Sequence, residues 1–547
     1  MNHLAVVEGA SFSTGDWLVV LVYMVTMLSI GLWAGRGQKD KRDYFLGGRD
    51  MPWWLVGLSI VASETSALTI IGVPAMAIGA LKYDDAGRLV MVGGNMTFMM
   101  LMVGHVIGRF LIAKLIIPHY FRGDVYTPYQ LLTRAFGQSA RSTAGFLSLI
   151  GMSLGQGVRV FVTAIPVTIV MQISFPWWST WMSISAIMVG ATIYTAIGGV
   201  KAVVWTEMIQ YFIYLSGGVF VLLYIPMLLK GPLAAPSGAE GWAAIGEVAG
   251  KNGVLQWFRT GIDNPFTGNN LIMGLLPMTF NILFALGFDQ LTAQRVLGCK
   301  DAKEGQKAML LSASLIVPQF LIFLLIGAGL YTYYTLNGNN FGNVLPVNPN
   351  TLDALNRPKP SPDFIFPVFI VNHLPLFFKG FLIAAILAAA TSVVSSGLSA
   401  MSSIAVMDLY KPFRKRPTTD KEELWLSRLV TFVAAIALIL VAFLCQQATL
   451  IFVLAFRLAG LTSGGILGAF IYAMIMKKGH PTPPVLGMLG AFIFMALFNV
   501  GMEYGKIPTV NWPWHTLIGT VVCLSVIAAT RPLFRESGTG KGIDVVE

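Results

Sequence analysis

Long apolar segments recur along the whole chain, separated by short polar or charged connections. Each has about 20 residues, the length that an α-helix needs to cross roughly 30 Å of hydrocarbon. Because the segments are unbroken rather than alternating, they predict membrane helices and not barrel strands. We expect thirteen spans, numbered one to thirteen in chain order, at residues 15–35, 54–80, 89–117, 143–172, 178–196, 203–229, 270–290, 308–335, 378–406, 428–446, 449–476, 484–501 and 513–531.

Composition excludes a water-soluble fold, since 55% of the 547 residues are hydrophobic and only 12% are charged. The net charge of +11 does not point to nucleic acid, because most of the 37 Lys and Arg residues fall in alternate connections. That distribution follows the positive-inside rule, with the N-terminus outside and the C-terminus inside. The segment before span one has no Lys or Arg and does not resemble a cleaved signal peptide. We predict a multi-pass protein of the cell membrane in contact with lipids.

One membrane domain accounts for nearly the whole chain, divided by the order of its spans. Transporter cores are often built from two inverted repeats, whose matching helices are interrupted near the bilayer midplane. Span two has the polar run Ser63 to Ser66 at its centre, and span seven, five spans later, contains Gly274, Pro277 and Asn281. We therefore expect an extra helix and basic cytoplasmic loop at 1–53, a first repeat at 54–229, an extracellular loop at 230–269, a second repeat at 270–476 with a further extracellular loop at 336–377, two extra helices at 477–531 and a cytoplasmic tail at 532–547.

Two charged residues lie deepest in the predicted spans, and each needs a partner or a water-lined cavity. Glu64 lies in span two, and Arg159 lies in span four with Gln156 about one turn away. Arg159 is placed to bind a carboxylate of a solute. The alternative is a structural pair between Arg159 and Glu64 or a helix-end carbonyl.

Small and hydroxyl side chains lie on one face of span nine at helical spacings of three, four and seven. Uncharged hydroxyl oxygens suit sodium, a hard cation, especially opposite carbonyls of an unwound helix. The alternative is that small residues allow close packing of helices in the membrane. The residues are Ala389, Ser392, Ser395, Ser396, Ser399 and Ser403.

Further polar residues lie near the predicted cytoplasmic ends of spans six and seven. Glu207 can serve an ion or be solvated, and both interpretations remain open. Asp289, Gln290, Gln294 and Arg295 are interpreted first as packing or gate contacts. Cys299, Cys445 and Cys523 have no paired or metal-ligand spacing, and no histidine motif of a metal site is present.

Four ordered segments resemble the sodium:solute symporter family, which includes carriers of sugars, proline, sialic acid and monocarboxylates. The similarity extends over roughly residues 15–475. It implies a LeuT-type core of ten helices, spans two to eleven, with a midplane site reached by alternating access. The segments are DYFLGGRDMPWWLVGLSIVASETSALTIIGVPA, GGVKAVVWTEMIQ, FDQLTAQRVLGCKDAKEG and AAILAAATSVVSSGLSAMSSIAVMDLY.

The resemblance also implies a sodium site between spans two and nine. Its ligands correspond to the carbonyls of Ala62 and Thr65 and to oxygens of Ala389 and Ser392. The family usually has a second Ser or Thr at the next position, where this chain has Val393. The site is therefore expected to bind sodium more weakly, to have water as a ligand, or to lie closer to a neighbouring position.

Some relatives use neighbouring serines and an acidic residue for a second sodium. By that resemblance, Ser392, Ser395, Ser396 and Glu207 form a hypothetical second site in this chain. Glu207 stands where Asp is usual, which keeps the charge and lengthens its reach.

The substrate expectation rests on Arg159, which is similar in position to the arginine that sialic acid carriers use for the substrate carboxylate. Hydroxyls of Ser66 and Thr69 match those on the broken helix of such carriers. Glu64 argues against an anion, since proline carriers also have an acid there and a carboxylate near Arg159 can neutralise it. We predict a sugar acid or other small carboxylate as substrate, with a neutral sugar or a proline-like amino acid as the alternative.

Other functional classes are less consistent with the sequence. A passive channel or facilitator does not need ion ligands spread over spans two, six and nine. An enzyme is not expected, because no catalytic arrangement of Ser, His and Asp or convergent metal ligands is present. The expected partners are a small solute, sodium and lipid, without nucleic acid; the sequence does not indicate the oligomeric state.

Overall fold

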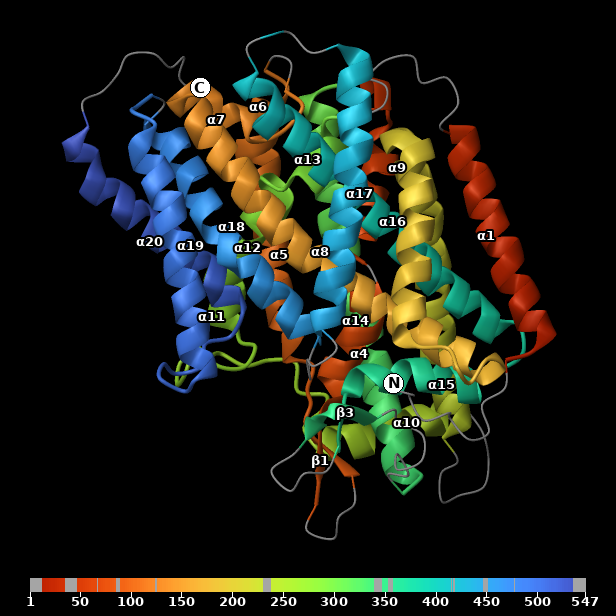
Figure 1. Cartoon of the computed structure of the whole chain (residues 1–547). Coiled ribbons are helices and arrows are strands. Elements are labelled where there is room, and N and C mark those ends of the chain that lie inside the picture. Colours follow the sequence, from red (N-terminus) through yellow and green to blue (C-terminus); the bar gives the residue numbers. More distant parts are fainter. Residues whose placement is uncertain are drawn as a thin grey trace.

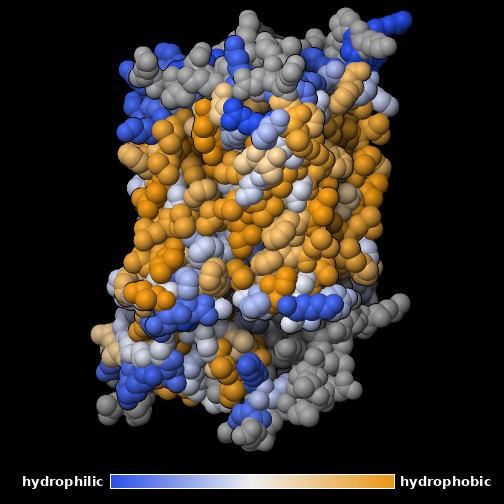
Figure 2. Space-filling model, turned by 90° about the vertical axis from the view of Figure 1, so that its left-hand side faces the viewer, coloured by the Kyte–Doolittle hydropathy of each residue, from blue (hydrophilic) through white to orange (hydrophobic). Residues whose placement is uncertain are grey.

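A bundle of long α-helices forms most of the molecule, with two small β-hairpins and short helices gathered at one end (Figure 1). On the side seen in Figure 2, a hydrophobic band lies between two hydrophilic ends, as expected for a protein with a membrane around its middle. This computed structural model describes residues 12–34, 47–65, 67–84, 89–122, 125–229, 238–338, 347–352, 358–414, 416, 419–445, 451–476 and 478–534.

Nine helices among the described residues are long and apolar enough to cross a membrane, or up to eleven if each of two bent pairs counts as one span. Two shorter apolar helices, Thr14–Met27 and Thr180–Thr192, coincide with predicted spans one and five. The longer helices are α1 (Thr14–Ala34), α5 (Leu101–Leu111), α8 (Gln138–Ser174), α9 (Thr180–Leu228), α14 (Ala302–Leu336), α16 (Phe378–Ile404), α17 (Asp420–Leu444), α18 (Ile451–Met476), α19 (Thr482–Glu503) and α20 (Pro513–Thr530).

The two bent pairs are the spans in which the sequence predicts interruptions. Helices α3 (Trp53–Glu64) and α4 (Ala67–Ile78) meet at 57°. The second pair bends by 61° between α12 (Thr279–Gly287) and α13 (Gln290–Val296). It begins with α11 (Leu271–Met273) and the π-turn η4 (Gly274–Met278). Such breaks free backbone groups, and their corresponding positions agree with an inverted repeat.

The chain departs from the expected boundaries after span two. Residues assigned to the end of span two and the start of span three instead form an antiparallel hairpin of β1 (Gly79–Tyr83) and β2 (Leu89–Gly93). Gly79 and Gly93 face each other in this pairing with φ of 87° and 74°, a conformation that favours glycine. The next span begins only at Thr97, where η2 (Thr97–Met100) leads into α5.

Predicted spans five and six lie within one helix, α9, rather than in two helices joined by a loop. The predicted outer segments also contain regular structure. These elements are α10 (Gly238–Lys251), β3 (Val347–Leu352), β4 (Pro358–Pro360), η5 (Pro362–Phe364) and α15 (Ile365–His373), and β3 pairs antiparallel with β4.

The first helix is fastened to α16, although it lies outside the predicted core. Asp16, which is buried, accepts hydrogen bonds from the backbone N–H groups of Phe377 and Gly380 at 2.9 and 3.2 Å. A carboxylate at this position satisfies free N–H groups at the start of α16 and interacts favourably with the helix dipole. Gly380 permits the contact, because a Cβ there would lie 2.4 Å from the carbonyl oxygen of Asp16.

Candidate functional site

A cavity of about 180 Å³ lies where the two broken spans meet α5, α8, α14 and α18. Its walls combine apolar and aromatic surface with a few polar groups, which is typical of solute sites. The polar and charged lining residues include Ser63, Glu64, Thr69, His105, Ser148, Gln156, Arg159, Asn281, Asp289, Thr292, Thr462 and Ser463.

Four of the five predicted substrate residues line this cavity together, namely Glu64, Thr69, Gln156 and Arg159. The fifth, Ser66, lies outside the described residues. Thr69 donates its hydroxyl to the carbonyl oxygen of Glu64 at 3.1 Å. The side-chain oxygen of Gln156 is buried and accepts no hydrogen bond among the described residues. The α3–α4 pair and α8 therefore place the predicted substrate residues that the structure describes around one cavity.

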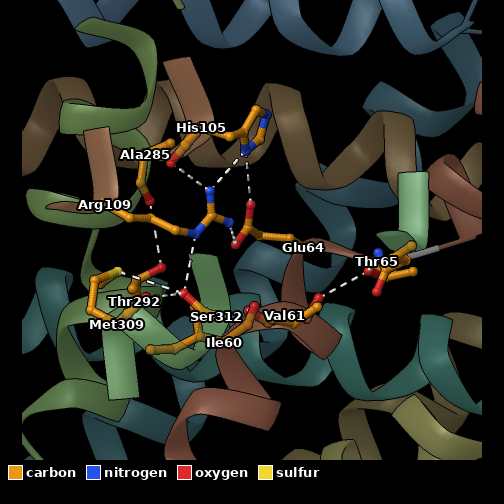
Figure 3. A network of polar contacts seen from close by, with 12 residues as sticks. Ile60, Val61, Glu64, Thr65, His105, Arg109, Ala285, Thr292, Met309 and Ser312 are labelled. Carbon is orange, nitrogen blue, oxygen red and sulfur yellow. Dashed lines mark hydrogen bonds and ion pairs between the residues drawn. The ribbon is translucent and has the colours of Figure 1, made fainter. Parts of the chain in front are cut away.

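Glu64 is held by Arg109 and not by Arg159, which corrects the expected alternative pair. The Arg109 guanidinium donates to the Glu64 carboxylate, and it also contacts His105 Nδ1 at 2.9 Å and Ser312 Oγ at 3.1 Å (Figure 3). Arg109 is fully buried, so the pair places no net charge in the cavity wall. The ion pair of Glu64 is therefore with Arg109, and Glu64 acts on Arg159 only from a distance.

Arg159 faces the cavity from the middle of α8 and is partly exposed there. Among the described residues, its guanidinium forms no hydrogen bond or ion pair. Asp289 and Glu64 are the acidic groups close enough to act on its charge. Because a cation at membrane depth needs a partner or water, this arrangement favours an anionic group as its partner.

Asp289 is the other acidic residue of the cavity, at the bend between α12 and α13. Its carboxylate caps α13 by accepting the N–H of Leu291 at 2.8 Å. It therefore carries the packing role expected from the sequence, while still lining the cavity.

The break between α3 and α4 begins at Thr65, the C-cap of α3. The Thr65 hydroxyl donates to the Val61 carbonyl at 2.9 Å and accepts a hydrogen bond from Gln319 (Figure 3 shows the first). Its hydroxyl is thus already engaged, which leaves the backbone carbonyls of Ala62 and Thr65 as the expected ligands. The side chains of Ala389 and Ser392 on α16 lie outside the described residues.

Glu207 forms a second buried ion pair, with Arg295 of α13. Arg295 Nη2 lies 2.5 Å from Glu207 Oε1, and Arg295 Nε lies 3.0 Å from Oε2. Ser59 Oγ donates to Oε2 at 2.5 Å, and Ser396 Oγ lies 3.4 Å from Oε1. Ser395 donates to the Ala191 carbonyl at 3.0 Å. Glu207 is therefore neither solvated nor free for an ion in this arrangement.

The structure also contains residues that sequence reasoning missed. The sequence does contain a sign of His105 and Arg109, since their spacing of four places two polar side chains on one face of α5. No local pattern assigned Arg109 to Glu64 or Arg295 to Glu207, because each pair joins helices far apart in the sequence.

Comparisons with known proteins agree with this geometry. A profile of the sodium:solute symporter family matches residues 44–490. The chain is 27% identical to a sodium/glucose cotransporter of Vibrio parahaemolyticus, over 98% of this chain and 94% of that protein. It is 23% identical to a sodium/sialic acid symporter of Aliivibrio fischeri, over 98% of this chain and 97% of the relative.

A solved structure of a substrate-bound, outward-open Na⁺-coupled sialic acid symporter shares the fold. Its TM-score is 0.77 at 23% identity, covering 96% of this chain and 99% of that one. The likeness establishes the LeuT-type architecture. The chain therefore belongs to the sodium:solute symporter family and is a sodium-coupled solute carrier of the plasma membrane rather than an enzyme.

Proposed function

We propose that this symporter imports a small organic anion, with a sugar acid as the first choice, and that Arg159 binds its carboxylate. The observation that supports this is that Arg159 faces the cavity without a direct partner among the described residues, while Asp289, the other acid of the lining, caps α13. Glu64 is paired with Arg109, whereas Arg159 has no ion pair among the described residues. A substrate carboxylate can accept two parallel hydrogen bonds from a guanidinium. Gln156 and Thr69 lie in the same cavity as further polar contacts, with Ser66 expected beside them.

Uptake into liposomes tests this assignment. Purified protein with an inward sodium gradient is screened with labelled N-acetylneuraminate, gluconate, lactate, glucose and proline. Arg159→Gln is expected to raise the KM of a carboxylate about 10- to 100-fold, the effect of losing a charged hydrogen bond. Lys307→Gln, which changes an exposed cation of α14, is the matched control. Uptake of carboxylates that survives Arg159→Gln unchanged contradicts the proposal.

A neutral sugar is the second candidate, favoured by the relative that is a sodium/glucose cotransporter. In that case, Asn281 and Asp289 are the expected hydroxyl ligands in the same cavity. Competition by glucose, without competition by gluconate or lactate, would reverse the order of the two candidates. Flux that persists without a sodium gradient would instead favour a passive facilitator.

The first sodium is proposed to bind at the α3–α4 break, with carbonyl oxygens of Ala62 and Thr65 and oxygens of Ala389 and Ser392. Free carbonyls of an interrupted helix are suitable ligands for a hard cation. Val393 offers no hydroxyl, so water is the proposed remaining ligand. Ser392→Ala is expected to raise the sodium concentration needed for half-maximal uptake; an unchanged value would remove Ser392 from the site.

A second sodium is proposed to bind at Ser392, Ser395, Ser396 and Glu207, on condition that Arg295 moves away from Glu207. Arg295 already supplies the positive charge beside Glu207, so a sodium ion there must displace the guanidinium. Sodium-dependent uptake that survives Ser395→Ala, Ser396→Ala and Glu207→Gln combined would exclude the second ion. Reciprocal changes of sodium and solute affinity are expected for any coupled site.

A further inference from the structure

Helix α20 contributes to the cavity, although it lies beyond the region matched by the family profile. That match ends at residue 490, whereas α20 covers Pro513–Thr530. Trp512, at its start, lines the cavity and is 1% exposed. Its ring stacks on Phe456 of α18, another lining residue, at a centroid distance of 4.3 Å and an angle of 29°.

One turn further along α20, Thr516 joins two polar lining residues that come from separate helices. Asn281 Nδ2 donates to Thr516 Oγ1 at 3.1 Å, and Thr516 Oγ1 lies 2.8 Å from Ser463 Oγ. Thr516 is fully buried. The hydrogen bond to Thr516 uses the amide nitrogen of Asn281 and so fixes the orientation of the amide. Its oxygen has no hydrogen bond among the described residues and is an acceptor for a ligand.

Hydrogen bonds to backbone carbonyls hold the start of α20 in place. Asn511 N donates to the Phe266 carbonyl at 2.9 Å, and Trp514 Nε1 donates to the Pro265 carbonyl at 2.9 Å. These contacts attach the start of α20 to the segment that leads into the second broken span. On the other side, a Cβ at Gly464 of α18 would lie 2.5 Å from the Thr516 carbonyl oxygen. The helices therefore approach too closely for α20 to shift without moving the cavity wall.

The wall formed in this way has a definite chemistry. It combines two aromatic rings with an amide oxygen and the hydroxyls of Ser463 and Thr462. Rings offer apolar area, and the amide and hydroxyls fix orientation through hydrogen bonds. This combination suits a solute that presents both apolar C–H surface and hydroxyl groups. It gives a simple aliphatic acid no partner for its polar atoms.

We propose that α20 is part of the solute site: Trp512 forms its wall, and Thr516 is a positioning residue that orients Asn281 and Ser463 toward a hydroxylated solute. The inference rests on the proposed function for the carboxylate at Arg159 and adds that the solute carries hydroxyl groups. A helix outside the repeat core then determines selectivity among anions.

Thr516→Val tests the positioning role, because it keeps the shape of the side chain and removes its hydroxyl. Full-length protein in liposomes is given labelled N-acetylneuraminate, gluconate, glucose or propionate, an acid without a hydroxyl group, with an inward sodium gradient. The variant is expected to raise the KM of hydroxylated solutes about three- to tenfold, as loss of one or two hydrogen bonds does, with Vmax and the KM of propionate unchanged. Thr516→Ser should restore the original KM.

Thr530→Val is the matched control, since the Thr530 hydroxyl bonds only to carbonyls of its own helix, away from the cavity. Trp512→Phe, a second variant, should raise the KM of hydroxylated solutes and leave that of propionate unchanged. An equal rise in KM for hydroxylated acids and propionate, or a change confined to Vmax, overturns the inference. If only glucose is carried, the proposed anion is wrong, while a raised glucose KM in Thr516→Val still supports the role of α20.

Discussion

Two glutamate–arginine pairs lie in the membrane-spanning part of the molecule, and they differ in access to water. In the first, Glu64 lines the solute cavity with 17% of its side chain exposed, while Arg109 is fully buried. In the second, Glu207 and Arg295 are only 1% and 3% exposed and bond through both carboxylate oxygens. The first pair neutralises a cavity wall, whereas the second joins α3, α9, α13 and α16.

The difference shows that burial depth and partner, rather than charge type, separate a solute-facing acid from a structural one. A sealed pair leaves a costly unpaired charge when one partner is removed. A pair beside a cavity can be compensated by water or solute. The following variants test this distinction, from the largest expected effect to the smallest.

Arg295→Leu is expected to destabilise the protein by about 3–5 kcal/mol, because Glu207 is left buried without a partner. The measurement is the melting temperature of purified protein in detergent. Replacing both residues, Glu207→Leu with Arg295→Leu, should recover much of the loss. Lys307→Ala, which removes a pair with Glu304 and a contact with the Trp53 ring at the surface, is the control and should change little. A double variant as unstable as the single one would argue against a sealed pair.

Glu64→Gln should cost less, about 1.5–3 kcal/mol, the range for a hydrogen bond to a charged group. Arg109 keeps its contacts with the His105 carbonyl and Ser312, and the cavity gives access to water. The variant also removes a negative charge from the cavity that contains Arg159, so gluconate should compete for uptake better relative to glucose. A loss of stability as large as that of Arg295→Leu would remove the distinction between the two pairs.

Each pair has a buried serine that accepts a hydrogen bond from the arginine Nε at 3.1 Å. Ser59 also donates to the Glu207 carboxylate, whereas Ser312 donates to the neutral carbonyl of Met309 at 2.7 Å. We expect Ser59→Ala to cost about 2 kcal/mol and Ser312→Ala about 1 kcal/mol, since bonds to charged groups are stronger. Melting temperatures of the two variants, each the other's control, should keep this order.

Ser396→Ala is expected to have the smallest effect on stability, under about 0.5 kcal/mol, because its 3.4 Å contact with Glu207 is long for a hydrogen bond. A second measurement on this variant is the sodium dependence of uptake. A raised sodium requirement with unchanged melting temperature would favour an ion beside Ser396. No change in either quantity would leave Arg295 as the cation for Glu207.

Much of the fold was predictable, because the membrane imposes a simple rule on length and polarity. The apolar spans and the two interrupted helices follow from hydropathy and from Gly, Pro and polar residues at mid-span. The β1–β2 hairpin was not predicted, since Leu89–Gly93 is as apolar as the span that follows it. The continuous helix α9 was not predicted, because apolar length alone gave two separate spans at 178–196 and 203–229.

The candidate site was predictable only in part. Glu64, Thr69, Gln156 and Arg159 were chosen as deep polar groups, and they line one cavity. Their partners were not predictable, because spacing along one helix carries no information about which distant helix packs against it. Nothing in the sequence indicated that Trp512 lines the cavity, since an aromatic residue at the end of a span is also typical of a membrane interface.

The sequence by itself determined that the chain spans a membrane many times and where polar groups interrupt its helices, because lipid leaves no other place for long apolar segments. Its motifs identified the family. Only the tertiary structure decided that Glu64 belongs to Arg109, that Glu207 belongs to Arg295, and that Arg159 faces the cavity without an ion pair among the described residues. These outcomes depend on which side chains come within a few ångströms of one another, and helix packing sets that distance.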